Sequence, residues 1–261
     1  MQISLIITTF NRPDALLIVL QSIERQSQIP YEVIIADDGS NDKTKKIIAD
    51  FSDQSKLKII HSFQEDKGFR AAKSRNRAIS KALSEYIILV DGDMILHPNF
   101  IYDHKKYAQE NCFVQGGRVM LSQERTDEVL ASNKISFNFL SKGLKNRKNA
   151  IHSNFLSKLF STKKNFLRGI KTCNVAFYRK DCIGVNGFNN KFEGWGREDT
   201  EFFARLMNAG IKRKTLKFNA IQYHLWHKEV SRQSLLQNDL LLKKTFNENL
   251  KSCEMGINQF L

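Results

Sequence analysis

The sequence has few of the residues that cross-link or stiffen a chain. Its 261 residues include only four cysteines and three prolines. The cysteines are widely separated and form no CxxC pair, which argues against a cysteine zinc site and against a disulfide framework. We therefore expect reduced thiols in a cytosolic protein. The four positions are Cys112, Cys173, Cys182 and Cys253.

Long apolar runs are also absent from the sequence. No stretch approaches the roughly 20 apolar residues that a membrane-spanning helix needs. The first ten residues, MQISLIITTF, lack the basic segment of a secretory signal and already have the pattern of a strand. Hydrophobic residues still make up 41% of the chain, which is enough for one sizeable core. These features predict a globular, cytoplasmic protein.

Acidic residues are missing from one long segment. None occurs between Glu128 and Asp181, although the whole chain has 27 acidic and 41 basic residues and a net charge of +14. This basic stretch, 129–180, predicts a polyanionic partner. The charge alone does not decide between nucleic acid, an anionic membrane and a phosphate-bearing substrate. Its basic residues are Lys134, Lys142, Lys145, Arg147, Lys148, Lys158, Lys163, Lys164, Arg168, Lys171, Arg179 and Lys180, with Phe137, Phe139, Phe155, Phe160 and Phe166 among them.

The first half of the chain alternates between strand and helix patterns. Short apolar runs predict strands at 3–8, 31–36, 57–61 and 86–90, and helical spacing predicts helices that begin near Pro13, Asn41 and Gly68. This order indicates an α/β fold with a parallel sheet and helices on both faces. Ligands bind at the carboxyl ends of the strands in such sheets. The residues expected along that rim are Thr8, Thr9, Asp37, Asp38, Asp91 and Asp93.

The second half is less regular. The predicted elements are strands at 113–120 and 172–178, a glycine-rich loop at 184–196, a helix at 198–209 and a strand or loop at 220–226. Gly116 and Gly117 would allow a bulge or a close backbone approach in the first of these strands. The tail, 231–261, is expected to be helical. Its predicted apolar face consists of Leu235, Leu236, Leu240, Leu242 and Phe246.

Two acidic motifs follow predicted strands. Asp91-Gly92-Asp93 places two carboxylates at the sheet edge, where Mg²⁺ or Mn²⁺ could be bound together with substrate phosphates. The alternative is a solvated turn, but the position at the ligand-binding rim favours a metal site. Asp37-Asp38-Gly39-Ser40 could accept hydrogen bonds from a pyrimidine or a ribose, or could form an ordinary turn with a helix cap.

Three further motifs combine aromatic, acidic and basic side chains. In GWGRED, 194–199, the Trp195 ring could pack on a sugar while Glu198 and Asp199 accept from its hydroxyls; the alternative is an ordinary acidic helix start. In YHLWH, 223–227, one imidazole could bind a metal, with Mn²⁺ favoured over Ca²⁺, although a lone histidine is more often structural. The basic helix start at 68–77 could meet a diphosphate or a base, or be a solvated cationic face.

Together these motifs resemble the family 2 inverting glycosyltransferases with a GT-A fold. ISLIITTFNRPDALLIVLQSI, DDGS, GFRAAKSRN and DGD occur in that family's order, and NGFNNKFEGWGREDTEFFARLMNAG resembles the acceptor segment of β-1,4-galactosyltransferases and bacterial chondroitin polymerases. The resemblance covers 1–120 and 170–230. It implies a Rossmann-like, mostly parallel sheet flanked by helices, in a single domain over 1–230. The implied parts are a nucleotide-sugar-binding half, 1–120, a basic helical insert, 125–170, an acceptor-binding half, 171–230, and a C-terminal helical extension, 231–261.

The resemblance also implies roles for particular residues. Asp199 would be the catalytic base, and the galactosyltransferases carry a further carboxylate where this chain has Thr200. Asp93 and His224 would bind Mn²⁺ or Mg²⁺, with Asp91 and His227 as further candidates. These galactosyltransferases also have methionine where this chain has Ile221. Acceptor-binding residues would be Glu198, Trp195 and Gly196, and nucleotide-sugar-binding residues would be Thr8, Phe10, Arg12, Asp38, Arg70, Arg75 and Asp91.

The implied reaction is a single in-line displacement that inverts the anomeric carbon of a UDP-sugar. The acceptor segment favours galactose or N-acetylgalactosamine as the donor sugar. The acceptor would be a saccharide, often lipid-linked, in bacterial surface polysaccharide or lipooligosaccharide synthesis. The basic stretch could then dock on the inner face of the cytoplasmic membrane or bind the acceptor itself. The alternative is a solvated helical insert whose Phe residues pack on the domain.

Other readings of the sequence are a protein that binds nucleic acid or anionic lipid through 129–180, a nucleotidyltransferase or phosphohydrolase on a similar sheet, and a non-catalytic module. Nucleic acid is disfavoured because Asp91, Asp93, Glu198 and Asp199 would repel a phosphate backbone.

Overall fold

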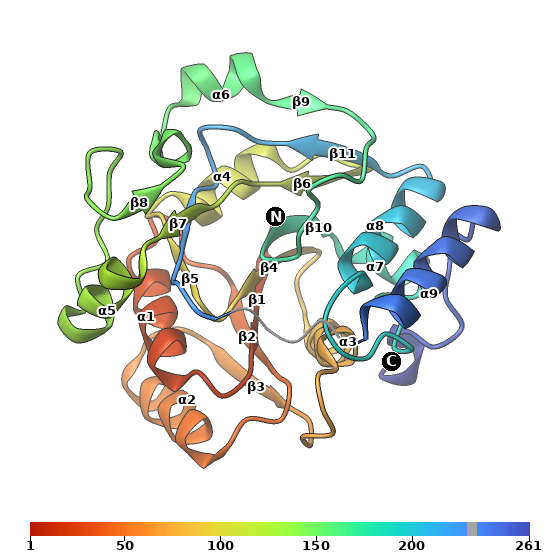
Figure 1. The fold of residues 1–261 in the computed structure, drawn as a ribbon, viewed down its shortest axis with the longest axis horizontal. Helices are drawn as coiled ribbons and strands as arrows, with labels where there is room; N and C mark the ends of the chain where they lie inside the picture. The colour runs from red at the N-terminus through yellow and green to blue at the C-terminus, as the bar shows by residue number, and fades with distance from the viewer. Residues whose placement is uncertain (229–233) are drawn as a thin grey trace.

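The computed structural model describes residues 1–228 and 234–261. An eight-stranded sheet forms its centre, in the order β3-β2-β1-β4-β10-β6-β11-β9 (Figure 1). The strands β1 to β4 are parallel, whereas β10 runs antiparallel to both β4 and β6. The strands are β1 (Ile3–Thr9), β2 (Glu32–Asp37), β3 (Ile59–Phe63), β4 (Tyr86–Asp91), β6 (Cys112–Gln115), β9 (Thr162–Lys163), β10 (Asn174–Tyr178) and β11 (Lys212–Thr215).

The parallel strands bring the expected polar residues to one rim. Thr8 of β1 lies opposite Asp91 of β4, and Thr9 lies opposite Asp37 of β2. The amide of Asp38 donates to the carbonyl of Thr9, which keeps the two strand ends together (3.1 Å). The predicted gathering of strand-end residues is therefore confirmed, and it follows from the parallel register alone.

Helices cover both faces of this sheet, as predicted. The helices α1 (Pro13–Glu24), α2 (Asp42–Gln54) and α4 (Phe100–Tyr107) pack one apolar cluster against one face. The helices α3 (Ala71–Lys81) and α8 (Glu198–Asn208) pack another cluster against the opposite face. Asn41 caps α2 by accepting from the amides of Lys43 and Thr44. The helix α3 begins at Ala71 rather than at Gly68, because the amide of Arg70 donates instead to Asp38.

The single strand predicted over 113–120 is wrong. The chain forms β6 and then β7 (Val119–Leu121), and these belong to different sheets. The break lies at Gly116, where a Cβ would come within 2.5 Å of the Asn174 amide group. The second sheet has the order β5-β12-β7-β8, with β5 (Met94–Leu96), β12 (Gln222–His224) and β8 (Leu144–Lys145). Of the two expected roles of the glycine pair, the close backbone approach is confirmed at Gly116, and the chain passes there from one sheet to the other.

The insert at 125–170 holds helices, as expected, and also short strands. Its helices are α5 (Gln123–Ser132), which begins just before it, the 3-10 helix η1 (Arg147–Ala150) and α6 (Asn154–Phe160). Its strands β8 and β9 join the second sheet and the edge of the central sheet, respectively. The insert is therefore tied into both sheets by backbone hydrogen bonds.

The apolar face predicted for the tail helix is confirmed at Leu242, which is buried, and wrong at Leu236, Leu240 and Phe246, which are exposed. The tail contains α9 (Leu235–Asn247) and the 3-10 helix η2 (Ile257–Gln259), while its predicted start at 231–233 lies outside the described residues. Leu236 is 82% exposed and Leu240 is 66% exposed. The residues that α9 buries are Asn238, Leu242 and Thr245, so the helix packs on α8 largely through polar contacts. Within 1–228 and 234–261, no helix has both the length and the apolar character to cross a membrane.

Candidate active site

A buried arginine, Arg75 of α3, joins residues from four separate parts of the chain. Its Nε donates to Thr8 Oγ1 (3.2 Å), and its Nη1 donates to Glu198 Oε1 (3.1 Å). Its Nη2 lies 3.6 Å from Asp91 Oδ1. Burial would lower the pKa of Arg75, but the carboxylates of Glu198 and Asp91 outweigh this and raise it. Arg75 is therefore a fixed positive charge between the strand rim and the start of α8.

Asp93 lies beside two histidines. Asp93 Oδ2 is 3.4 Å from His224 Nε2 and 3.3 Å from His227 Nε2. The pairing of β12 with β5 produces this contact, because it places His224 opposite Met94 and bonds the Leu225 amide to the Asp93 carbonyl (3.0 Å). Burial would raise the pKa of Asp93, but hydrogen bonds and positive charge from the histidines hold it below its usual range. The hydrogen bond to Asp93 raises the pKa of His227.

The Asp93–His224–His227 cluster has the donor set of a cation site. Its three ligand atoms lie within 4.8 Å of one another. Among the described residues, Asp93 Oδ1 is buried and has no hydrogen-bond partner. His227 Nδ1 lies 2.7 Å from the Lys228 carbonyl and can donate to it, so the neutral imidazole would present its Nε2 lone pair to a cation in the cluster. One carboxylate and two imidazoles suit a divalent transition metal, so the residues fit a Mn²⁺ site better than a Mg²⁺ site.

Arg12 lies against this cluster. It was expected to contact the nucleotide sugar, and its Nη1 is 3.8 Å from Asp93 Oδ2. Sequence reasoning did not anticipate that contact, because Arg12 and Asp93 are far apart in the chain. The arginine therefore supplies positive charge next to the three possible metal ligands.

Asp38 is held at the rim by residues of the segment that leads into α3. It accepts from the Arg70 amide (2.7 Å) and from the side chain of Gln64. Burial raises the pKa of Asp38, although both of these hydrogen bonds oppose the shift. The Arg70 guanidinium is directed instead to the carbonyl of Glu65. Gln64 was not identified from the sequence, because only the fold shows that it follows β3 at the same rim.

Two of the predicted aromatic residues are exposed. Phe10 is 45% exposed just after β1, and Trp195 is 39% exposed just before α8. The loop around Trp195 is fixed from both sides. The Gly194 amide donates to the Phe69 carbonyl (2.9 Å), and the Asn238 side chain donates to the Gly196 carbonyl (2.9 Å). Both glycines have positive φ, so a side chain at either position would be strained.

Asp199 lies in the first turn of α8, next to Glu198. Its Oδ1 accepts from the Thr200 amide (2.6 Å). Asp199 is partly exposed as a residue, but protein atoms surround its carboxyl group. This burial, together with the charge of Glu198, raises the pKa of Asp199 to about 7. The group can therefore exchange a proton near neutral pH, which suits a general base.

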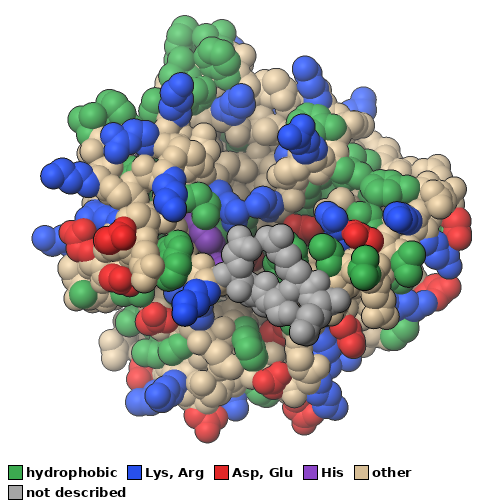
Figure 2. Space-filling model, viewed as in Figure 1, with side chains coloured by type: hydrophobic (Ala, Val, Ile, Leu, Met, Phe, Trp, Pro, Cys, Tyr) green, Lys and Arg blue, Asp and Glu red, His purple; other side chains and the backbone are tan. Residues whose placement is uncertain are grey.

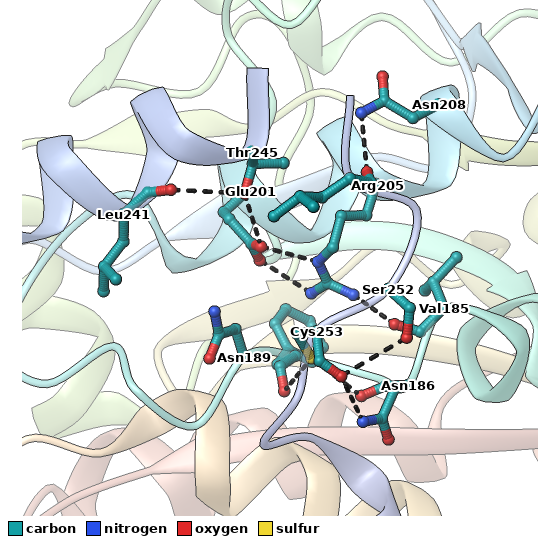
Figure 3. Close-up of polar contacts among 12 residues, drawn as sticks. Val185, Asn186, Asn189, Glu201, Arg205, Asn208, Leu241, Thr245, Ser252 and Cys253 are labelled. Atoms are coloured by element: carbon teal, nitrogen blue, oxygen red, sulfur yellow. Dashed lines mark hydrogen bonds and ion pairs between the residues drawn. The ribbon is translucent and has the colours of Figure 1, made fainter. Parts of the chain in front are cut away.

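The rest of α8 is fixed by a buried ion pair. Arg205 Nε and Nη2 donate to the two carboxylate oxygens of Glu201 at 2.7 and 2.8 Å (Figure 3). The same guanidinium donates to the carbonyls of Val185 and Gly187, while Thr245 of α9 donates to Glu201. Glu201 is therefore committed to holding the helix, and it does not supply the carboxylate that Thr200 replaces.

A family comparison identifies the chain. The family described as Glycosyl transferase family 2 matches residues 4–178, which is more than half of the sequence. The chain belongs to glycosyl transferase family 2. A second family, described as the N-terminal domain of galactosyltransferase, matches residues 157–228. The two matches overlap and together include most of the predicted site residues of this glycosyltransferase.

Curated relatives of this family 2 glycosyltransferase include polysaccharide synthases. It is 29% identical over 240 residues to hyaluronan synthase of Pasteurella multocida and 28% identical over 238 residues to chondroitin synthase of Escherichia coli. Each alignment covers 85% of this chain but only 24% and 34%, respectively, of the relative. The chain therefore spans between a quarter and a third of the length of these relatives.

Solved structures confirm the GT-A fold of this glycosyltransferase. The structure of S. aureus TarS 1-349 in complex with UDP-GlcNAc superposes with a TM-score of 0.62 at 17% identity, covering 93% of this chain and 65% of that chain. At this identity the likeness concerns the fold. The sequence-based prediction of a GT-A, α/β architecture is therefore correct.

The structure brings the predicted site residues into one region. Arg75 connects the strand rim to α8, and Asp93 connects the rim to His224 and His227. Figure 2 shows histidine near the centre of one face, with Lys and Arg side chains around it. Arg70 is the exception among the charged candidates, because its guanidinium contacts the backbone of Glu65.

Proposed function

We propose that this family 2 enzyme transfers a hexose or an N-acetylhexosamine from a UDP-sugar to a saccharide acceptor, with inversion. The likeness to hyaluronan and chondroitin synthases supports a role in bacterial surface polysaccharide or lipooligosaccharide synthesis. The fold likeness to TarS in complex with UDP-GlcNAc supports a UDP-sugar donor. The match to a galactosyltransferase domain favours galactose or N-acetylgalactosamine as the transferred sugar.

The donor nucleotide would bind the 1–120 half at the rim of the parallel strands. Asp38 would accept from the uracil, with Thr8 and Phe10 beside the base and ribose. The raised pKa of the buried Asp38 carboxyl suits a group whose hydrogen-bond partner arrives with the ligand. Asp91 would meet the ribose or the donor sugar, with Arg75 behind it.

The Asp93–His224–His227 cluster would hold a divalent cation, with Mn²⁺ favoured by the two imidazoles. A cation bound there supplies positive charge that offsets the charge developing on the departing diphosphate. The positive charge of Arg12 would also offset the charge that develops on the diphosphate. Its guanidinium lies 3.8 Å from Asp93 and could turn toward a diphosphate oxygen.

The acceptor would bind the 171–230 half at the start of α8. The Trp195 ring would pack against the sugar, with Gly196 giving it close access, and Glu198 would accept from a hydroxyl. Asp199 would take the proton of the attacking hydroxyl. Attack from the side opposite UDP inverts the anomeric carbon, so an α-linked donor gives a β-linkage. The proton acceptor needs a pKa near the working pH, and that of Asp199 is about 7.

The contacts of Arg75 are the observation that carries this proposal. One buried guanidinium touches Thr8 and Asp91 on the donor side and Glu198 on the acceptor side. These contacts place the proposed donor-side and acceptor-side residues next to one another, which supports a direct transfer between two bound sugars.

The experiment is the Asp199→Asn variant, measured for UDP-sugar binding by calorimetry and for sugar transfer by UDP release. Donor binding should match that of the unmodified enzyme, and transfer should fall at least about 100-fold because the base is lost. Asp53→Asn is the matched control, since it makes the same change at an exposed carboxylate on α2, away from Asp199. Transfer by Asp199→Asn at the unmodified rate would overturn the assignment of the base.

We also propose a lipid-linked acceptor and a location on the inner face of the cytoplasmic membrane. The support is the basic stretch 129–180, which has twelve cationic residues and no acidic one. Anionic headgroups and the phosphates of a lipid-linked saccharide are both matched by such a surface.

A further inference from the structure

The helix α6 has an inverted pattern of exposure. Its one fully buried side chain is that of Ser157, which is 0% exposed. Three large apolar side chains are exposed: Phe155 is 72% exposed, Leu159 is 61% exposed and Phe160, whose ring also packs against Phe218, is 51% exposed. A helix on a water-exposed surface normally buries its apolar side chains and exposes its polar ones. The exposed side of α6 is therefore apolar, and it suits an apolar environment better than water.

Polar contacts fix α6 to the fold from beneath. His152 Nε2 lies 3.0 Å from the buried Asp103, and the Ser153 amide donates to the Phe218 carbonyl (2.9 Å). Lys106 donates to Asn154 at the start of the helix (3.0 Å). These contacts hold the helix without using Phe155 or Leu159. The apolar side chains are thus held outward on a fixed element.

Exposed lysines surround these apolar side chains. Lys158 lies on α6 itself, and Lys163 and Lys164 follow it directly. The strand β9 pairs with β11, which brings Lys163 opposite Lys214 at the sheet edge. There is no acidic residue in 129–180 or in 211–228, so no carboxylate in these segments offsets the charge. Figure 1 shows α6 and β9 along one rim, above β11, and Figure 2 shows apolar and cationic side chains there.

We propose that this docking surface, made of α6, β9 and β11, binds an anionic bilayer. Phe155, Leu159 and Phe160 would enter the headgroup region, while the lysines would contact lipid phosphates. This inference rests on the proposed function, because a lipid-linked acceptor would lie in the same bilayer. It adds the orientation: α6 faces the membrane, and α2 and β3 lie on the opposite side of the molecule (Figure 1).

Charge and shape favour a bilayer over other occupants. Nucleic acid would satisfy the lysines, but an aliphatic side chain such as Leu159 offers no stacking surface for a base. A second copy of the chain would place two cationic surfaces against each other. Lysines also protect exposed sheet edges, which accounts for Lys163 on β9 but not for Phe155 or Leu159 on α6.

The test is flotation of the full chain with vesicles of phosphatidylcholine alone or mixed with phosphatidylglycerol. Binding should require phosphatidylglycerol and weaken in high salt.

The triple variant Lys158→Gln, Lys163→Gln, Lys164→Gln should lower the partition coefficient about 100-fold, given about fivefold per lysine. The double variant Phe155→Ser, Leu159→Ser should lower it at least about tenfold. The matched control is Leu236→Ser, Leu240→Ser on α9, which removes an equally exposed i, i+4 pair and should leave binding unchanged.

A second readout reports insertion directly. Phe155→Trp should gain fluorescence quenching by brominated lipids beyond that of the native tryptophans. Transfer to a soluble acceptor should stay unchanged in every docking variant, so failure of docking and failure of the transferase proposal remain distinguishable. Flotation of the double variant at the unmodified level, or equal binding to neutral vesicles, would overturn the proposal. So would lysine-dependent binding to single-stranded RNA without flotation.

Discussion

The carboxyl group of Asp199 is costly to ionise where it lies. Burial and the neighbouring Glu198 raise its pKa to about 7, well above the value of 3.8 for a free aspartate. The sequence predicted the position of this residue at a helix start. It did not predict the shifted pKa, because the shift depends on how deeply the fold encloses the carboxyl group.

The pH dependence of transfer follows from this pKa. If Asp199 accepts the proton, kcat/KM should rise about tenfold per pH unit below pH 7 and level off above it. Initial rates of UDP release between pH 5 and 9 would measure the profile. A profile without an inflection between pH 6 and 8 would contradict the assignment.

The same pKa has a consequence for stability. The folded state holds the Asp199 proton more tightly than the unfolded state, so stability is lost as pH rises from about 4 to about 7. Asp199→Asn removes this cost. The variant should exceed the unmodified protein in free energy of unfolding by on the order of 1–2 kcal/mol at pH 8, with little difference at pH 4. Urea denaturation at the two pH values would test this, and a difference that does not change with pH would count against it.

The metal cluster makes a separate prediction at the level of single residues. His224→Ala and His227→Ala should each weaken Mn²⁺ binding at least about tenfold, because each removes one of three ligand atoms within 4.8 Å of one another. The free Mn²⁺ signal in electron paramagnetic resonance would measure binding without any substrate. His97→Ala, whose ring stacks on His152 away from the cluster, is the control. Unchanged affinity in His227→Ala would remove that residue from the site.

At the scale of elements, the position of α8 depends on the buried pair of Arg205 and Glu201. Arg205→Met leaves the Glu201 carboxylate buried without its partner and should lower the free energy of unfolding by about 3–5 kcal/mol. Arg197→Met at the N-cap of the same helix is the control, because the pair of Arg197 and Asp239 is partly exposed to solvent and should contribute about 1 kcal/mol or less. Equal losses in the two variants, measured in urea, would contradict the role given to the buried pair.

The sequence predicted well those elements whose hydrophobic residues follow a single clear pattern. The strands β1, β2 and β4 are buried runs of β-branched residues, and their parallel order follows from the alternation with helices. The failures have physical causes. Residues 113–120 have the pattern of one strand. Asn174 packs so closely on Gly116 that a Cβ there would clash, and this contact involves a distant element that the local pattern does not show. Part of the face of α9 was misjudged because α8 and the loop before it offer polar partners, Glu201 and the Gly196 carbonyl.

At the scale of the whole molecule, the tail locks the loop that leads to the site. The Ile257 amide donates to the Asn186 carbonyl (2.9 Å), and Asn190 donates to the Gly256 carbonyl (2.9 Å). Asn76 of α3 holds the same loop through Phe188 and Asn190. The sequence offered no signal for this arrangement, because it depends on contacts between segments more than 60 residues apart.

Gly256 is the residue at which this packing is tightest. A Cβ there would come 1.7 Å from the Asn186 carbonyl oxygen, so Gly256→Ala must separate the tail from the loop. The expected loss in free energy of unfolding is about 2–4 kcal/mol. Gly184→Ala is the control, because a Cβ at that position has no neighbour within 4 Å and the residue ends a helix. Comparable thermal stability of the two variants would contradict this account of the tail.

The site as a whole was predictable to the extent that the topology determines it. Thr8, Asp38 and Asp91 meet because parallel strands end at one edge, and the parallel direction of these strands could be read from the alternation of strands and helices in the sequence. The contacts of Arg12 with Asp93 and of Gln64 with Asp38 could not, because each depends on the path of a loop. The resemblance to glycosyltransferases supplied the roles, and the fold supplied the distances.

The central claim is that the enzyme uses a UDP-sugar and a cation held by Asp93. The most direct measurement is nucleotide release from a panel of UDP-, GDP-, CMP- and dTDP-sugars with Mn²⁺, with and without EDTA, for the unmodified enzyme and Asp93→Ala. We predict release from one UDP-sugar, slow in the absence of an acceptor, that EDTA and Asp93→Ala each abolish. Release from no sugar nucleotide, or release that persists in Asp93→Ala, would contradict the claim.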